Sequence, residues 1–194
     1  MRDNICLGID LDGVVIDCYN YILEKGKEYL GNLDINYTGQ EICTIFGVSE
    51  QIEDYFWKDH ELDYTINAPI KSGFLETIKT LDKLEIPYYF ITNRDLIDDV
   101  NIRKLLIEQW LHHLIGHPVN VHINTKGSKV EACKLYGINL FIDDTIRVIE
   151  DLANAGIDVI RFIEPYNNTC AIKDNIFPMN NWKEIHDFII SRNM

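Results

Sequence analysis

The chain has 194 residues, of which 46% are hydrophobic and 25% are charged, a composition typical of one globular domain, alone or with a small insert. Its formal net charge of −13 disfavours a polymeric nucleic acid as a partner, because such binding depends on lysine and arginine. The five cysteines form no CxxC pair, the N-terminus has no signal-peptide pattern, and no apolar run approaches the roughly 20 residues of a membrane span. We therefore expect a cytoplasmic protein with reduced thiols.

Short apolar runs alternate with helical patterns along most of the chain. The expected strands are, in chain order, Ile5–Ile9, Tyr88–Ile91, Val119–Ile123, Leu140–Ile142 and Val159–Ile163. The expected helices are Gly73–Leu84, Leu96–Leu114, Ser128–Tyr136, Ile146–Ala155 and a last one near Trp182–Ile190. This alternation predicts an α/β fold in which a doubly wound parallel sheet carries helices on both faces.

The segment after the first expected strand interrupts this alternation, since it has helical patterns and no convincing strand. Thr38-Gly39-Gln40-Glu41 has the pattern of a capping box that opens a helix over Ile42–Phe46, and a further helix is expected over Glu50–His60. Pro69 ends the segment. A small helical cap inserted after the first strand is one interpretation, and an additional layer of core helices is the other. The preferred division is a core of residues 1–16 and 70–194 and a cap of residues 17–69.

Polar side chains follow three of the expected strands, at the edge where open parallel sheets bind their ligands. They are Asp10-Leu11-Asp12-Gly13, Thr92-Asn93-Arg94 and Asp143-Asp144-Thr145. Lys129, at the start of an expected helix, is a fourth polar residue at the same edge. Asp10 and Asp143 offer the oxygen ligands that Mg²⁺ takes, and Lys129 offsets the charge of a phosphate. Asp12 stands where a turn can bring it to a leaving oxygen. Each piece alone also suits a turn, a calcium site, a helix cap or a solvated lysine, but together they supply a nucleophile, an acid/base and a metal site.

In combination these residues resemble the four motifs of the haloacid dehalogenase superfamily. The matching segments are Asp10-Leu11-Asp12-Gly13-Val14-Val15, Ile91-Thr92-Asn93-Arg94, Lys129 and Phe141-Ile142-Asp143-Asp144. The resemblance covers nearly the whole chain and implies a phosphatase with an aspartyl-phosphate intermediate. An acid at position 12 favours a phosphatase over a dehalogenase, because a dehalogenase has no leaving alcohol to protonate.

The resemblance also implies a role for each matching residue. It makes Asp10 the nucleophile, Asp12 the general acid/base, Thr92, Asn93 and Lys129 the phosphate-binding residues, and Asp10, the backbone carbonyl of Asp12 and Asp143 the ligands of Mg²⁺, with Asp144 acting on the metal through water or a neighbouring ligand. Lys126 is an alternative to Lys129. We prefer Lys129 because it lies in the first turn of an expected helix.

A closer resemblance is to the 5′(3′)-deoxyribonucleotidase branch of this superfamily. It is carried by Ala68-Pro69-Ile70-Lys71-Ser72-Gly73-Phe74, Pro165-Tyr166-Asn167 and Asn181-Trp182-Lys183-Glu184-Ile185. It implies a nucleoside monophosphate as substrate, although Cys18 replaces the base-stacking aromatic residue of well-known members. Four aromatic residues of the expected cap either stack on a base or belong to its core: Phe46, Tyr55, Phe56 and Trp57.

Other functions remain open at this stage. Within the same chemistry, the substrate is alternatively a sugar phosphate or another small phosphomonoester. In a different class, the chain is a phosphate-binding or regulatory protein without turnover. The sequence leaves both a monomer and a homodimer open.

Overall fold

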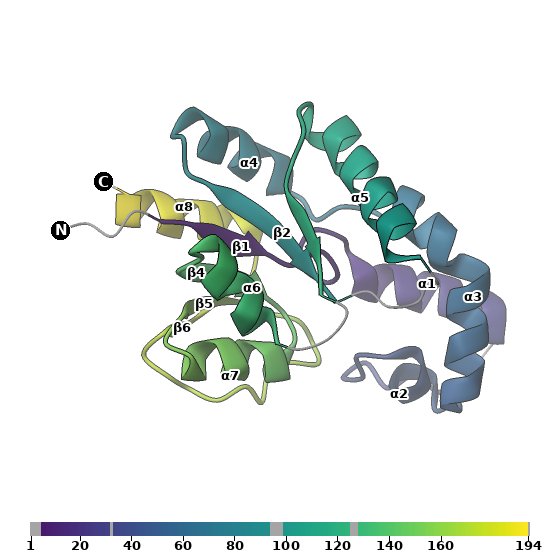
Figure 1. Ribbon diagram of the computed structural model, residues 1–194. Coiled ribbons are helices and arrows are strands. Elements are labelled where there is room, and N and C mark those ends of the chain that lie inside the picture. Colours follow the sequence, from purple (N-terminus) through teal and green to yellow (C-terminus); the bar gives the residue numbers. More distant parts are fainter. Residues whose placement is uncertain (1–4, 32, 94–98, 125–127, 194) are drawn as a thin grey trace.

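The computed structural model describes residues 5–31, 33–93, 99–124 and 128–193. Within them, six strands form one sheet in the order β3-β2-β1-β4-β5-β6, and every neighbouring pair is parallel (Figure 1). The strands are β1 (Leu7–Ile9), β2 (Tyr88–Thr92), β3 (Val121–Ile123), β4 (Leu140–Asp143), β5 (Asp158–Phe162) and β6 (Ile176–Met179). The helices are α1 (Cys18–Leu30), α2 (Ile42–Phe46), α3 (Glu50–Asn67), α4 (Phe74–Lys83), α5 (Val100–Ile115), α6 (Lys129–Tyr136), α7 (Ile146–Asn154) and α8 (Trp182–Asn193). The predicted α/β fold with a parallel sheet is confirmed.

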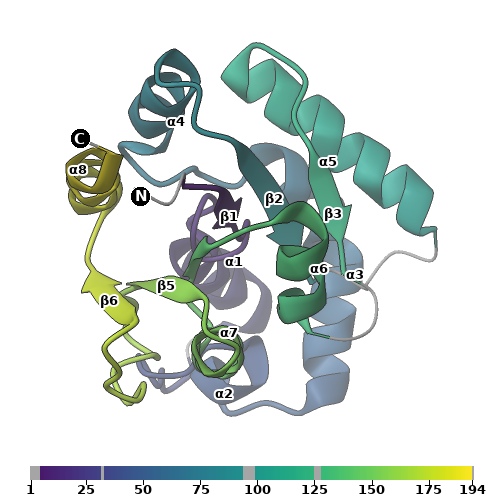
Figure 2. The same cartoon turned by 60° about the vertical axis from the view of Figure 1, so that its left-hand side comes forward.

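Both faces of the sheet are covered by helices, as the apolar character of the strands requires. Leu7 and Ile9 of β1 pack into one core cluster with residues of α4, α5 and α8. Phe141 of β4 points to the other face and packs with residues of α6 and α7. Figure 2 shows α4 and α5 on the opposite side of the sheet from α6 and α7. Side chains alternate along each strand, so one apolar run supplies both cores.

Helices α1, α2 and α3 form a third cluster between β1 and α4 in the chain. Their buried face includes Ile22, Ile45 and Phe56. The chain leaves and re-enters the sheet region at one place, because Ile16 and Ile70 pair as an antiparallel bridge. Figure 1 shows the three helices grouped beyond the ends toward which β1 and β2 run. They therefore lie next to the carboxyl edge of the sheet.

The predicted capping box before α2 is wrong in its residues, although the helix itself is confirmed. Thr38 donates from its backbone nitrogen and its hydroxyl to Asn36 Oδ1, at 3.1 and 2.8 Å, and so belongs to the preceding turn. The capping box instead joins Glu41 and Thr44, and the Glu41 N–H donates to Thr44 Oγ1 at 3.0 Å. The pattern identified the helix start but paired the wrong side chain with it.

Helix α3 and strand β6 differ from the sequence expectation. Helix α3 continues past His60 to Asn67, because Tyr64 packs against the ring of Tyr21, with the ring centroids 5.0 Å apart. Strand β6 is not among the strands expected from the sequence, and it contains Pro178, which has no N–H to donate within a sheet. It lies at the edge of the sheet, where a missing N–H is tolerated. No helix among the described residues has the length and apolar character that crossing a membrane requires.

Trp182, the first residue of α8, ties that helix to the turn after β1. Its side chain is fully buried, and its indole Nε1 donates to the Val14 carbonyl at 2.9 Å. We expect Trp182→Phe to lower the free energy of unfolding by about 1–3 kcal/mol, because it removes this donor from a buried carbonyl and leaves unfilled space. Urea denaturation of both proteins measures the difference. An unchanged unfolding midpoint would contradict a structural role for this hydrogen bond.

Candidate active site

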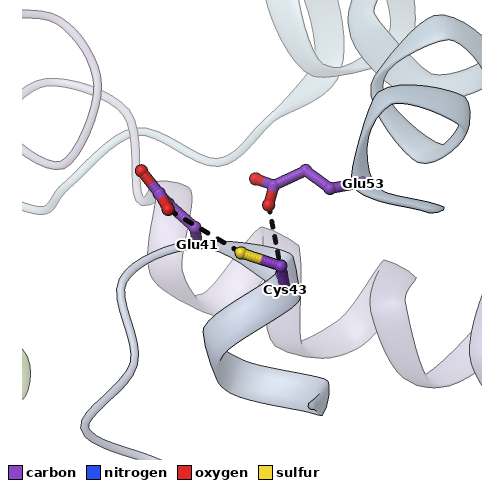
Figure 3. Close-up of side chains that lie close together, drawn as sticks. All are labelled: Glu41, Cys43 and Glu53. Carbon is purple, nitrogen blue, oxygen red and sulfur yellow. Dashed lines mark hydrogen bonds between the residues drawn. The ribbon is translucent and has the colours of Figure 1, made fainter. Parts of the chain in front are cut away.

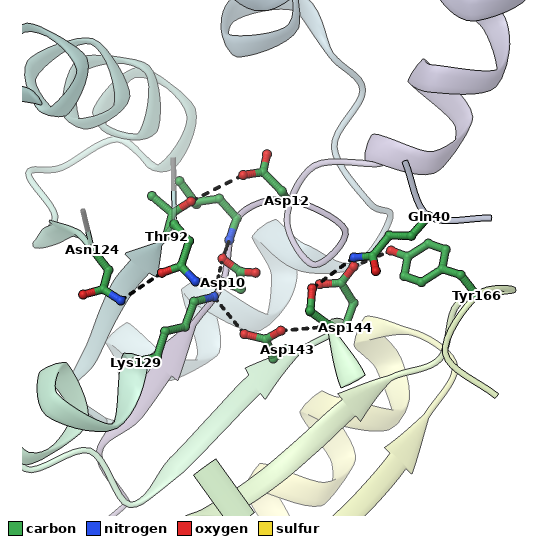
Figure 4. Close-up of polar contacts among 12 residues, drawn as sticks. Asp10, Asp12, Gln40, Thr92, Asn124, Lys129, Asp143, Asp144 and Tyr166 are labelled. Carbon is green, nitrogen blue, oxygen red and sulfur yellow. Dashed lines mark hydrogen bonds and ion pairs between the residues drawn. The ribbon is translucent and has the colours of Figure 1, made fainter. Parts of the chain in front are cut away.

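The polar residues predicted from the sequence meet at the carboxyl edge of the sheet. Asp10 directly follows β1, Thr92 is the last residue of β2, and Asp143 is the last residue of β4. Lys129 is the first residue of α6, whose N-terminus is capped by Ser128 Oγ, an acceptor for the Val130 N–H at 3.2 Å. Parallel strands end on one side of the sheet, so residues that are far apart in sequence become neighbours (Figure 4).

Lys129 lies between two carboxylates in the centre of this cluster. Its Nζ is 2.8 Å from Asp10 Oδ1 and 2.8 Å from Asp143 Oδ2, and the whole residue is only 3% exposed. Burial alone would lower the pKa of Lys129, but the facing carboxylates of Asp10 and Asp143 outweigh burial and raise it above the ordinary value. The ammonium group is therefore charged at neutral pH.

Two further donors orient the carboxylates on either side of Lys129. The backbone N–H of Leu11 donates to Asp10 Oδ1 at 2.8 Å, and the N–H of Thr145 donates to Asp143 Oδ1 at 2.9 Å. Asp143 is completely buried. These bonds use the turns that follow β1 and β4, so the backbone itself holds both carboxylates toward the cluster.

The three buried aspartates fit a hard divalent cation. One carboxylate oxygen from each of Asp10, Asp143 and Asp144 lies within 4.8 Å of the others. Asp144 Oδ1 is buried and accepts no hydrogen bond from any group in the described residues. An all-oxygen donor set with an unpartnered carboxylate oxygen suits Mg²⁺ better than softer metals, which prefer sulfur or nitrogen. The group includes Asp144, for which the sequence analysis expected an action on the metal through water or a neighbouring ligand.

Two of these aspartates have raised pKa values. Burial, together with the charges of Asp143 and Asp12, raises the pKa of Asp10 to about 7 against the opposing effect of Lys129. Burial, together with the charges of Asp143 and Asp10, raises the pKa of Asp144 well above its ordinary value. A cation beside these groups would favour their charged forms, because opposite charge lowers a carboxyl pKa.

Asp12 lies two residues after Asp10, and its carboxyl group accepts hydrogen bonds from two hydroxyl groups. The Tyr64 hydroxyl donates to Asp12 Oδ1, and Thr92 Oγ1 donates to Asp12 Oδ2 at 3.4 Å. Asn93 lies at the exposed rim, where its Oδ1 accepts from Asn124 Nδ2 at 3.0 Å. The carboxyl of Asp12 thus points into the same space as Thr92. The metal role expected for its backbone carbonyl stays a prediction.

Two tyrosines at this site were not assigned a role from the sequence. Tyr64 belongs to the part of α3 that the helical pattern did not cover. Tyr166 was matched only as part of a C-terminal motif, yet its hydroxyl donates to Asp144 Oδ2. Neither contact leaves a local sequence signal, because the partners are 52 and 22 residues apart. Lys126, the alternative to Lys129, lies outside the described residues, as does Arg94.

Two adjoining cavities open beside the cluster, with volumes of about 490 and 360 Å³. Asp12, Cys18, Glu41, Glu53, Trp57 and Asn93 line both of them. Among the four aromatic residues in question, Trp57 lines both cavities, while Phe46 and Phe56 are buried in the cluster of α1, α2 and α3. Tyr55 is 53% exposed and lines neither cavity. These volumes lie in the range of small-molecule sites.

A second group of potential ligands, Glu41, Cys43 and Glu53, lies near the N-terminal ends of α2 and α3 (Figure 3). Glu53 Oε2 accepts from the backbone N–H of Cys43 at 3.1 Å, and the Cys43 thiol lies 3.8 Å from Glu41 Oε2. These contacts satisfy donors at the N-terminus of α2. We therefore interpret this group as helix capping, and the buried aspartates as the candidate metal site.

Comparisons with known proteins agree with this fold. No family model matches the chain. It is 24% identical over 188 residues to a protein of Oceanobacillus iheyensis named “Putative nucleotidase”, covering 94% of this chain and 96% of that protein. A HAD family hydrolase from Deinococcus radiodurans, solved with bound phosphate and sodium, superposes with a TM-score of 0.68 at 16% identity, covering 99% of this chain and 97% of the other. A haloacid dehalogenase-like family protein from Streptococcus pneumoniae superposes with a TM-score of 0.68 at 12% identity, covering 97% of this chain and 100% of the other. The fold is that of HAD hydrolases.

Proposed function

We propose that the chain is a Mg²⁺-dependent phosphomonoester hydrolase in which Asp10 forms an aspartyl-phosphate. The observation that carries this proposal is the buried grouping of Asp10 and Asp143 around Lys129, with Asp12 and Thr92 beside them. The backbone N–H of Leu11 and the ammonium group of Lys129 both contact Asp10 Oδ1, so the carboxylate has one defined position for attack. The fold shared with HAD hydrolases supports the same chemistry.

In the first step an oxygen of Asp10 attacks phosphorus, and the bond from phosphorus to the ester oxygen breaks. The proton on Asp12 passes to the departing oxygen, which leaves as an alcohol. In the second step Asp12 removes a proton from water, and the resulting hydroxide attacks the aspartyl-phosphate. The Asp10–phosphorus bond breaks, which releases phosphate and restores both carboxyl groups. The Tyr64 hydroxyl keeps Asp12 in one orientation throughout, which leaves the Thr92 hydroxyl free to turn from Asp12 to the substrate.

Lys129 and Thr92 have the chemistry to bind phosphoryl oxygens during these steps, through an ammonium and a hydroxyl group. Asp10, Asp143 and Asp144 would hold Mg²⁺, with the Asp12 carbonyl as a further proposed ligand. When bound, the ion supplies positive charge that offsets repulsion between the carboxylates and the phosphate.

The segment of residues 17–69 is proposed as the cap over this site. Tyr64 of α3 reaches Asp12, and Gln40 Nε2 donates to Thr145 Oγ1 at 3.1 Å, so the segment contacts two of the site's loops. Trp57 is its aromatic side chain at both cavities. Closure of such a segment excludes water from the phosphoryl group and places groups against the substrate.

A nucleoside monophosphate is the proposed substrate. The cavity volumes, the Trp57 ring and the 24% identity to a protein named as a nucleotidase support it. The larger cavity is lined by several carboxylates, Asp12, Glu41, Glu50, Glu53, Asp54 and Glu61. Such a lining favours one phosphate over two or three, because additional phosphates would be repelled.

The test of the enzyme class is phosphate release from p-nitrophenyl phosphate with and without Mg²⁺. We expect turnover in Mg²⁺ to fall at least about 100-fold in EDTA and to return on adding the metal, because the ion offsets charge at phosphorus. Equal rates in both conditions would contradict metal dependence. The absence of turnover under all conditions would favour the phosphate-binding alternative. A screen of nucleoside monophosphates against sugar phosphates then tests the substrate class, and a preference for sugar phosphates would overturn the nucleotidase proposal.

A further inference from the structure

The loop after β5 makes an unusual set of contacts with Asp144. The side-chain nitrogen of Asn167 donates to the backbone carbonyl of Asp144 at 2.7 Å and to that of Phe162 at 2.8 Å. Its side-chain oxygen accepts from the Glu164 N–H at 3.1 Å. Asn167 is completely buried. The side-chain amide of Asn167 therefore connects the loop after β5 to the backbone of Asp144 through buried hydrogen bonds.

Tyr166 holds the side chain of the same aspartate. Its hydroxyl donates to Asp144 Oδ2, while Asp144 Oδ1 is buried and accepts no hydrogen bond in the described part of the chain. One of the Asp144 carboxylate oxygens lies within 4.8 Å of an oxygen of Asp10 and one of Asp143. Tyr166 therefore holds Oδ2 and leaves Oδ1 without a hydrogen bond among the described residues. Figure 4 shows Tyr166 on the side of Asp144 away from Lys129.

The turn after Asp10 fits closely against this pair. Gly13 has a φ of +76°, and a Cβ at that position would lie 2.1 Å from Asp144 Oδ2 and 3.0 Å from the Tyr166 hydroxyl. The Tyr166 ring also packs 5.9 Å from the ring of Tyr19, in α1. Rotation of Asp144 is consequently restricted by the turn on one side and by the tyrosine on another.

We propose that Tyr166 is a positioning residue that fixes the orientation of Asp144 so that Oδ1 remains directed at the divalent cation. This inference rests on the proposed function only in taking the three aspartates as the metal site. Hydrogen-bonding partners of metal ligands commonly change metal affinity about 10–100-fold when they are removed. Tyr166 acts through Asp144 and takes no part in bond making at phosphorus.

The test is Tyr166→Phe in the full chain, with Tyr89→Phe as the matched control. Tyr89 packs on Tyr136 at the other end of β2 from Thr92, so its substitution also removes one hydroxyl but leaves Asp144 untouched. Mn²⁺ binding is followed by electron paramagnetic resonance and Mg²⁺ binding by calorimetry. Thermal unfolding in EDTA checks that both variants fold. Turnover of p-nitrophenyl phosphate is measured at a series of Mg²⁺ concentrations.

We expect Tyr166→Phe to weaken Mn²⁺ and Mg²⁺ binding about 10-fold or more, with kcat at saturating Mg²⁺ within about 3-fold of the parent. The control is expected to bind both ions as the parent does. Equal metal affinity in Tyr166→Phe and the parent would overturn the inference, as would equal weakening in the control. If the parent protein binds no divalent ion, both the inference and the proposed metal site are overturned. A parent that binds Mn²⁺ but hydrolyses no phosphomonoester overturns the proposed function alone, because the binding comparison still decides the role of Tyr166.

Discussion

Asp10→Asn is expected to lower turnover of p-nitrophenyl phosphate about 10⁴-fold or more, the scale seen when a catalytic nucleophile is removed. An amide oxygen is a much weaker nucleophile than a carboxylate, so the proposed aspartyl-phosphate cannot form. The parent enzyme, quenched with acid during turnover, should yield a phosphorylated peptide that contains Asp10, and the variant should yield none. Mass spectrometry of the two digests measures this directly.

The same substitution is expected to leave the protein folded. Asp10 lies with Asp143 and Asp144 in a cluster of like charge, so a neutral side chain of the same shape reduces repulsion there. Lys129 keeps a charged partner in this variant, because its Nζ also lies 2.8 Å from Asp143. The melting temperature in EDTA should hold or rise. Asp151→Asn, on the exposed face of α7, is the matched control and should retain the activity of the parent. Full activity in Asp10→Asn would exclude covalent catalysis by this residue.

Lys129→Met is expected to have the largest effect on stability. The substitution leaves the buried carboxylates of Asp10 and Asp143 facing each other without the ammonium group that now lies 2.8 Å from both. Removing one member of a buried ionic group typically costs about 3–5 kcal/mol of unfolding free energy. Urea denaturation in EDTA at neutral pH measures it. Turnover should also be lost, because Lys129 is proposed to bind the phosphoryl group.

The loss of unfolding free energy in Lys129→Met should become larger as the pH rises. Burial already raises the pKa of Asp10 to about 7, and without Lys129 it rises further. The folded variant then retains protons that the unfolded chain releases near its ordinary carboxyl pKa of about 4, so stability falls as pH rises through the folded-state pKa. We expect a small deficit near pH 5 and a larger one near pH 8. Lys183→Met, which removes an exposed lysine, should show no such trend. A deficit that is equal at all pH values would argue against unpaired carboxylates as its cause.

Much of the fold followed from local patterns. Apolar runs of strand length alternating with helical patterns were sufficient to predict a parallel sheet covered on both faces, because such strands are buried on each side. The alternation also located the carboxyl edge, and hence which residues follow each strand. Asp10, Thr92, Lys129 and Asp143 were identified in this way, since position at a strand end or helix start is a property of the local chain.

Elements without a strong local signal were missed or misplaced. Strand β6 contains Pro178, which is tolerated only because the strand lies at the sheet edge, and an edge position is set by the order of all strands. The last turns of α3 are stabilised by packing of Tyr64 against Tyr21 and Trp57. Tertiary packing overrode weak helical periodicity there, and it carried Tyr64 to Asp12.

The sequence by itself determined which chemical groups this protein brings to the edge of its sheet, because strand ends and helix starts are local features. The tertiary structure alone decided which oxygens of those groups contact Lys129, Tyr64 and Tyr166, and that Asp144 Oδ1 accepts no hydrogen bond among the described residues. Those pairings join residues from separate elements. Their geometry depends on how the helices and loops pack, which no short segment of sequence specifies.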